Sequence, residues 1–201
     1  MKKGDSGSII PLIGQISLFM PSPIAFCRRV LLHFRRKKAF RLINGKLAGT
    51  THFEKKRKLL NAIGHEIGEG TKIVGPIFLT ATLKTGKDCW IGADFKATGN
   101  GVVEMGDCCD IAPEVSIATG GHEIGTHERR AGKGLNENIT IGNGCWIGQR
   151  VLLAHGAIIP DGCVIAAGAV VIGHKDFEPD TLIGGVPAKT IKHYEDGERG
   201  E

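Results

Sequence analysis

An aliphatic residue recurs every six positions from Ile141 onward, and this period constrains the fold more than any other feature of the chain. Five hexads follow one another without a break, with the sequences IGNGCW, IGQRVL, LAHGAI, IPDGCV and IAAGAV. A six-residue period matches neither the 3.6-residue period of an α-helix nor the two-residue alternation of a strand. It predicts an all-β solenoid of very short strands, in which about 18 residues complete one triangular coil.

The composition agrees with a narrow interior and many tight corners. Glycine accounts for 30 of 201 residues and aromatic residues for only 5%, so small and aliphatic side chains must fill the core. The fifth position of the five hexads is always small or β-branched: Cys145, Val151, Ala157, Cys163 and Ala169. The same register appears upstream at Met105, Ile111 and Ile117, and around Ile91.

The six cysteines show no metal-ligand spacing, and two of them, Cys108 and Cys109, are adjacent. Cys89, Cys145 and Cys163 lie inside apolar runs. We interpret them as small buried hydrophobic residues in a reducing, cytoplasmic compartment, without a disulfide framework.

The N-terminal third is basic, because residues 1–66 carry 14 of the 26 lysines and arginines but 3 of the 21 acidic residues. Residues 24–44 predict a basic amphipathic helix, and residues 54–63 predict a short helix that ends at Gly64. Such an arm is typical of contact with an anionic surface, but solvated helix faces give the same pattern. The apolar run at 9–20 is too short to span a membrane, which needs ~20 residues.

The hexads of the form [LIV]-G-x-x-x-x resemble those of hexapeptide-repeat acyltransferases, which fold as a left-handed parallel β-helix. Residues 67–192 resemble more narrowly the maltose/galactoside O-acetyltransferase group, through IGEGTKIVGPIF, IAPEVSIATGGH, ITIGNGCWIGQRVLL, VIAAGAVV and LIGGVPAKTIK. The resemblance implies a β-helix at 67–192, preceded by a helical basic arm at 1–66. Residues 193–201 are expected to be a polar tail.

The hexad pattern is lost at residues 120–138, GGHEIGTHERRAGKGLNEN, which predicts a polar loop that projects from the solenoid. His122 occupies the position of the histidine that the resembled enzymes use as general base. The chain departs from those enzymes at Glu123, where they have proline. Glu123, Glu128 or a backbone carbonyl are alternatives for orienting the His122 ring.

The resemblance implies acetyl transfer from acetyl-CoA to a hydroxyl of a sugar or glycan, in a homotrimer that binds CoA between subunits, with no metal required. The positions that match the family's CoA-binding residues are Gln149, Ala167, Lys175, Lys189 and Lys192. Thr98 and Asn100 match its acceptor-binding segment, and Arg129, Arg130 and Lys133 offer charge for an anionic acceptor. We further expect peripheral contact of residues 1–45 with an anionic membrane.

Three other interpretations use the same fold. The first is a serine O-acetyltransferase, which usually has a longer helical N-terminal domain. The second is a zinc enzyme similar to γ-class carbonic anhydrases, with His122 and His127 as the HxxxxH pair and His65, His155 or His174 as a third ligand. The third is a non-catalytic scaffold. The basic arm lacks a recognisable nucleic-acid reader, so no specific nucleic acid is expected as a partner.

Overall fold

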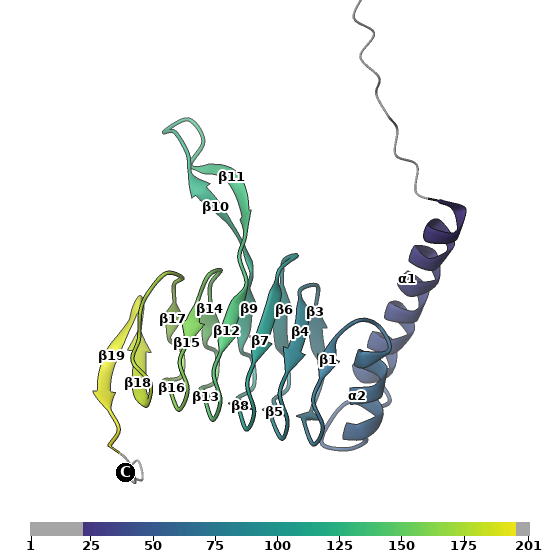
Figure 1. Cartoon of the computed structure of the whole chain (residues 1–201), viewed down its shortest axis with the longest axis horizontal. Coiled ribbons are helices and arrows are strands. Elements are labelled where there is room, and N and C mark those ends of the chain that lie inside the picture. Colours follow the sequence, from purple (N-terminus) through teal and green to yellow (C-terminus); the bar gives the residue numbers. More distant parts are fainter. Residues whose placement is uncertain (1–21, 196–201) are drawn as a thin grey trace, which may run out of the picture.

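The computed structural model describes residues 22–195, in which two helices lead into a parallel β-solenoid (Figure 1). The helices are α1 (Pro23–Ile43) and α2 (Phe53–Asn61). The predicted fold class, a parallel β-helix with a short helical N-terminal arm, is therefore confirmed. The apolar run at 9–20 and the last six residues of the tail lie outside the described residues.

The solenoid has three parallel sheets, one for each side of the coil. Sheet A contains β1 (Glu66–Ile67), β4 (Thr82–Thr85), β7 (Val102–Met105), β12 (Ile139–Ile141) and β15 (Ile158–Ile159). Sheet B contains β2 (Lys72–Ile73), β5 (Trp90–Ile91), β8 (Asp110–Ile111), β13 (Trp146–Ile147), β16 (Val164–Ile165), β18 (Thr181–Gly185) and the antiparallel β19 (Ala188–His193). Sheet C contains β3 (Ile77–Leu79), β6 (Phe95–Thr98), β9 (Ser116–Ala118), β14 (Leu152–Leu153) and β17 (Val170–Val171).

The register of the sheets follows the hexad pattern. Ile147 lies opposite Ile165 in the next coil and opposite Ile111 in the preceding one. All three side chains are fully buried, as are the corner cysteines Cys145 and Cys163. The Cys145 thiol donates to the carbonyl of Pro160 at 3.0 Å, so it completes a turn between coils. The aliphatic residue of each hexad thus fills the interior, and the small residue at its fifth position fits the corner.

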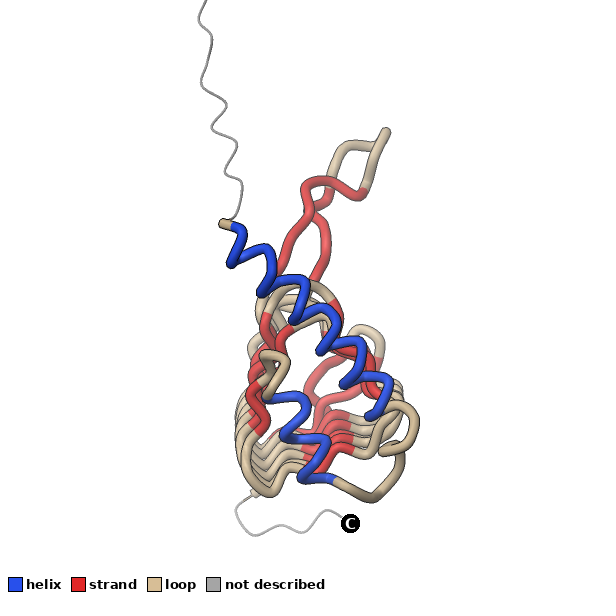
Figure 2. The backbone as a smooth tube through the Cα atoms, turned by 90° about the vertical axis from the view of Figure 1, so that its right-hand side faces the viewer, coloured by secondary structure: helices blue, strands red, loops and turns tan. Residues whose placement is uncertain are grey.

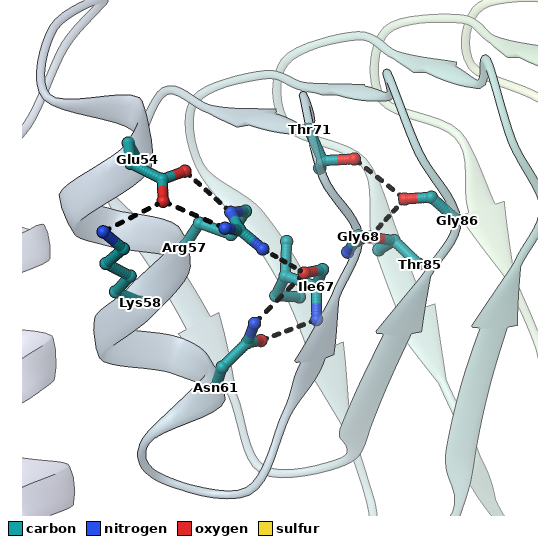
Figure 3. Close-up of polar contacts among 9 residues, drawn as sticks. All are labelled: Glu54, Arg57, Lys58, Asn61, Ile67, Gly68, Thr71, Thr85 and Gly86. Carbon is teal, nitrogen blue, oxygen red and sulfur yellow. Dashed lines mark hydrogen bonds and ion pairs between the residues drawn. The ribbon is translucent and has the colours of Figure 1, made fainter.

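Helix α2 contacts the first coil through polar side chains (Figure 3). Asn61 brackets the backbone of Ile67, because its Oδ1 accepts from the Ile67 N–H at 2.7 Å and its Nδ2 donates to the Ile67 carbonyl at 3.1 Å. Arg57 donates to the same carbonyl at 3.3 Å and pairs with Glu54 at 2.8 Å. These bonds fix the point at which the helical segment turns into β1.

The most deeply buried charge of the described chain lies on this helix. Lys56 is fully buried, and its Nζ donates to the carbonyls of Gly49 at 2.7 Å and Val74 at 2.9 Å. The ammonium also lies 4.9 Å from the centroid of the Phe53 ring. Burial lowers the pKa of Lys56. The side chain therefore ties the connection between the helices to the first coil.

A buried histidine closes the same end of the solenoid. The side chain of His65 is 7% exposed, and its Nδ1 accepts from the backbone N–H of Leu83 at 3.1 Å. Burial, followed by the nearby charge of Arg36, lowers the pKa of His65 to about 4. His65 is therefore neutral at physiological pH and belongs to the core.

Helix α1 crosses the end of the solenoid, and its N-terminal half extends beyond it (Figure 2). Of the residues of α1, only Ala39 and Ile43 are buried. Asn44, just after the helix, holds the backbone of Ile77 through bonds of 2.8 Å and 2.9 Å. The apolar side chains near the helix start are exposed: Ile24, Phe26, Val30, Leu31, Leu32 and Phe34. Among the described residues, no helix is both long and apolar enough to cross a bilayer.

Candidate functional site

The segment that interrupts the hexads is a β-hairpin that projects from the solenoid (Figure 1). Strands β10 (Gly120–Ile124) and β11 (Ala131–Asn136) pair antiparallel, with His122 opposite Gly134. The hairpin leaves the coil in the turn that follows β9. We call this the hairpin corner, which comprises the turns after the sheet C strands β6, β9, β14 and β17. The sequence predicted a projecting loop without regular structure, because GGHEI and AGKGLN do not alternate between apolar and polar residues.

His122 is exposed, and its ring is oriented by a backbone carbonyl. The Nδ1 atom lies 3.0 Å from the carbonyl oxygen of Gly132 on the facing strand. Because a carbonyl can only accept, Nδ1 must carry a proton in this bond, and in the neutral ring the lone pair is then on Nε2. Glu128 pairs instead with His127 at 3.0 Å. Of the alternatives raised for orienting the ring, the structure favours the carbonyl.

The foot of the hairpin is fixed to the preceding coil by asparagine side chains. Asn136 Oδ1 accepts from the backbone N–H of Asn100 at 3.0 Å, and Asn138 Oδ1 accepts from that of Val102 at 2.9 Å. Asn100, a predicted acceptor residue, therefore lies at the same corner as His122. Thr98, the other predicted acceptor-binding residue, lies on β6, and its hydroxyl donates to the Ile117 carbonyl at 3.4 Å.

A cluster that the sequence did not predict as a set lies in the turns that follow the hairpin. Glu137 Oε2 is 2.7 Å from His155 Nδ1 and 3.1 Å from His174 Nε2. The bond from His155, followed by that from His174, lowers the pKa of the Glu137 carboxyl. Within residues 22–195 this is the one group of three or more side chains arranged to hold a metal. The predicted pair of His122 and His127 is not part of it: His122 Nδ1 bonds to the Gly132 carbonyl and His127 Nε2 to Glu128.

Two predicted CoA-binding positions stack on adjacent coils at another corner, which we call the B–C corner because its turns connect sheet B to sheet C. The N–H of Gly168, next to Ala167, donates to the Gln149 carbonyl at 2.8 Å. The Gln149 amide donates to Glu114 at 3.0 Å, and Arg150 pairs with Glu114 at 2.7 Å. The bond from Arg150 lowers the pKa of Glu114. Within one chain, Gln149 and Ala167 therefore lie at a different corner of the solenoid from His122, which is on the hairpin corner.

The three predicted lysines lie at the C-terminal end of the solenoid. Lys175 Nζ donates to the Ala188 carbonyl at 3.2 Å, which places it beside β19. Lys189 and Lys192 are exposed on β19, and Lys192 Nζ lies 5.5 Å from the ring centroid of Tyr194. The basic residues of the hairpin, Arg129, Arg130 and Lys133, are all exposed.

A scan against family models matches residues 138–173 to the family described as bacterial transferase hexapeptide (six repeats). The matched segment is the run of hexads from which the fold was predicted. Fold and repeat together define the chain as a hexapeptide-repeat protein.

Comparisons with whole proteins narrow the class. Over 148 residues the chain is 29% identical to galactoside O-acetyltransferase of Escherichia coli (strain K12), covering 73% of this chain and 72% of that protein. A solved structure of galactoside acetyltransferase in complex with coenzyme A superposes with a TM-score of 0.70 and 27% identity, over 83% and 82% of the two chains. The crystal structure of a maltose O-acetyltransferase from Clostridium difficile 630 superposes with a TM-score of 0.55 and 28% identity. The match covers 82% of this chain and 89% of that chain. In repeat, sequence and fold the chain is similar to hexapeptide-repeat acetyltransferases.

Proposed function

We propose that this protein transfers an acetyl group from acetyl-CoA to a hydroxyl of a sugar or glycan, with His122 as general base. The observation that carries the proposal is the bond of 3.0 Å from His122 Nδ1 to the Gly132 carbonyl, because in the neutral ring it directs the lone pair to Nε2, on an exposed side chain. The structures named above, one with coenzyme A and the other a maltose O-acetyltransferase, support the donor and the acceptor class.

The residues would divide the chemistry as follows. Nε2 of His122 takes the proton of the acceptor hydroxyl, and the oxygen bonds to the carbonyl carbon of the thioester. A backbone N–H stabilises the negative charge on the carbonyl oxygen. The carbon–sulfur bond then breaks, and the proton on His122 passes to the departing sulfur. No cysteine acts as nucleophile in this scheme, which agrees with the burial of Cys145 and Cys163.

The separation of His122 from Gln149 and Ala167 supports a homotrimer as the working unit. In one chain they lie at two different corners of the coil, so a single chain does not assemble base and CoA-binding turns together. A second copy of the chain that places its B–C corner beside the hairpin corner of the first would bring the base and the CoA-binding turns together. Lys175, Lys189 and Lys192 would then meet the anionic part of CoA.

We retain the proposed division into an arm at 1–66, an acyltransferase domain at 67–192 with its catalytic segment at 120–138, and a tail at 193–201. The arm would bring a cytoplasmic protein to an anionic membrane through residues 1–45. Exposed Phe26 and Phe34, among the basic residues of α1, support this role. Phe26→Ser/Phe34→Ser should reduce sedimentation with anionic vesicles. Unchanged sedimentation, or equal binding to neutral vesicles, would contradict it.

The acetyl-transfer proposal is tested by thiol release from acetyl-CoA with a galactoside, maltose and serine as acceptors. His122→Gln should lower turnover by ~10²–10⁴-fold on the preferred acceptor while the affinity for CoA stays the same. His127→Gln, on the same hairpin, is the matched control and should leave turnover unchanged. Full activity of His122→Gln would remove this residue from the mechanism, and a preference for serine would replace the sugar acceptor.

A further inference from the structure

Glu137, His155 and His174 present three ligand atoms to a common point. One atom from each residue can be chosen so that all three lie within 4.8 Å of one another. The Glu137 and His155 side chains are 31% and 29% exposed, whereas that of His174 is 71% exposed. The cluster is therefore half-buried on one side and open to solvent on the other.

The backbone holds each of these residues in place. The Glu137 N–H donates to the Thr119 carbonyl at 2.9 Å, across the foot of the hairpin. His155 lies one coil further on, in the turn after β14, and His174 lies in the turn after β17. The His174 N–H donates to the Gly156 carbonyl at 3.2 Å, and His174 has a positive φ of 57°. The three side chains thus project from stacked turns of one corner and not from a flexible loop.

The distances fit a small metal ion. Bonds of about 2.0–2.2 Å in a tetrahedral zinc site place the ligand atoms about 3.4 Å apart. Glu137 Oε2 lies 2.7 Å and 3.1 Å from the two histidine nitrogens, and all three ligand atoms lie within 4.8 Å of one another, so these separations bracket the zinc value. Two imidazoles with one carboxylate are a donor set that suits zinc better than the oxygen-preferring magnesium or calcium.

The cluster is also in contact with the hairpin. A Cβ built on Gly121 would overlap Cδ2 and Nε2 of the His155 ring. The ring of His155 therefore packs directly against the residue that precedes His122. Whatever fixes His155 also fixes the start of β10.

We propose that Glu137, His155 and His174 form a three-ligand site for a divalent transition-metal ion, best matched by zinc, at the foot of the hairpin. Its fourth coordination position faces solvent on the side of the exposed His174 ring. The ion links the end of the hairpin to the two following coils. It is a positioning element for the strand that carries His122 and takes no part in the proton transfer.

The test is a calorimetric titration of zinc into the full-length protein after treatment with a chelator, together with metal analysis after dialysis. We expect one zinc per chain and a higher Tm with zinc than without. His174→Gln should weaken zinc binding by more than about 100-fold, exceeding the usual cost of losing an outer-shell partner. His155→Gln should do the same, and Co²⁺ should give the visible spectrum of a tetrahedral site in wild-type protein only.

His127→Gln is the matched control, because His127 is also an exposed histidine next to a carboxylate, Glu128, but lies outside the cluster. Its zinc affinity should equal that of wild type. Absence of stoichiometric zinc in wild type, or unchanged affinity in His174→Gln, would overturn the site. Loss of zinc in His127→Gln would overturn it as well. The exposed position of His174 lets its variant fold, which an unchanged melting curve without zinc would verify. None of these measurements depends on acetyl transfer.

Discussion

Replacement of Gly121 by alanine provides a quantitative test of the packing at the foot of the hairpin. Gly121 is not among the glycines with positive φ, so its backbone conformation is open to alanine. The obstacle is the His155 ring, which the new Cβ would overlap. To reach ordinary van der Waals contact, the ring must move by about 1 Å, because normal carbon contacts begin near 3.5 Å.

The expected cost follows from what this movement breaks. Displacing the ring stretches the 2.7 Å bond from His155 Nδ1 to Glu137, a charge-assisted bond that is half-exposed and worth about 1 kcal/mol. Overpacking adds a cost of similar size. Gly121→Ala should thus destabilise the metal-free protein by about 2 kcal/mol. In a His155→Ala background the obstacle is gone, and the same change should stabilise by about 0.4–1 kcal/mol through the unfolded state.

The assay is urea unfolding of the wild type, both single variants and the double variant, at one protein concentration and with chelator present. The two substitutions should be coupled by about 2–3 kcal/mol, with the sign of the Gly121→Ala effect reversed between the backgrounds. Costs that add to within about 0.5 kcal/mol would refute the packing of His155 against Gly121.

Three further predictions concern the solenoid and its helical end. Burial lowers the pKa of His65 to about 4 in the folded protein, against 6.5 in the unfolded chain. Between these two pH values only the unfolded state takes up a proton. Stability should therefore be fully present above pH 6.5 and fall by about 2 kcal/mol from pH 7 to pH 5, a dependence that His65→Gln should flatten in urea titrations. Ile147→Ala should cost about 3–4 kcal/mol because the side chain is fully buried, whereas Ile124→Ala on the exposed hairpin should change the unfolding free energy by less than about 0.5 kcal/mol. Lys56→Met should cost about 3 kcal/mol by thermal or urea unfolding, because two carbonyls lose a charged donor; an unchanged midpoint would show that these bonds contribute nothing net.

The solenoid was predictable from sequence because each coil repeats the same physical constraint. Ile147 and Ile165 occupy equivalent places in successive coils, and their burial is encoded in the period itself. The hairpin was predictable only as an interruption. Its strands are fixed by the pairing of His122 with Gly134 and by Asn136, neither of which has a local hydrophobic signal.

The candidate site shows the same division. Resemblance singled out His122, but the group that orients it is a backbone carbonyl, which no side-chain pattern reveals. Glu137 and His155 are 18 residues apart, so the coil length alone brings them together. His174 comes one position later than the period requires, because it lies in register with Gly156, whose carbonyl accepts from its N–H, and not with His155. This offset, and not chemistry, hid the third member of the cluster.

The contacts of the two helices have a consequence for how molecules meet one another. Helix α2 packs on β1 and β2, and α1 packs on β3, so the first strand of every sheet is covered by a helix. A parallel strand left bare at the end of a sheet offers unpaired N–H and C=O groups to another molecule. A chain shortened to begin at β1 would present three such templates at once, aligned with the solenoid axis. The helical segment thus caps the solenoid and prevents end-to-end association of chains into fibres.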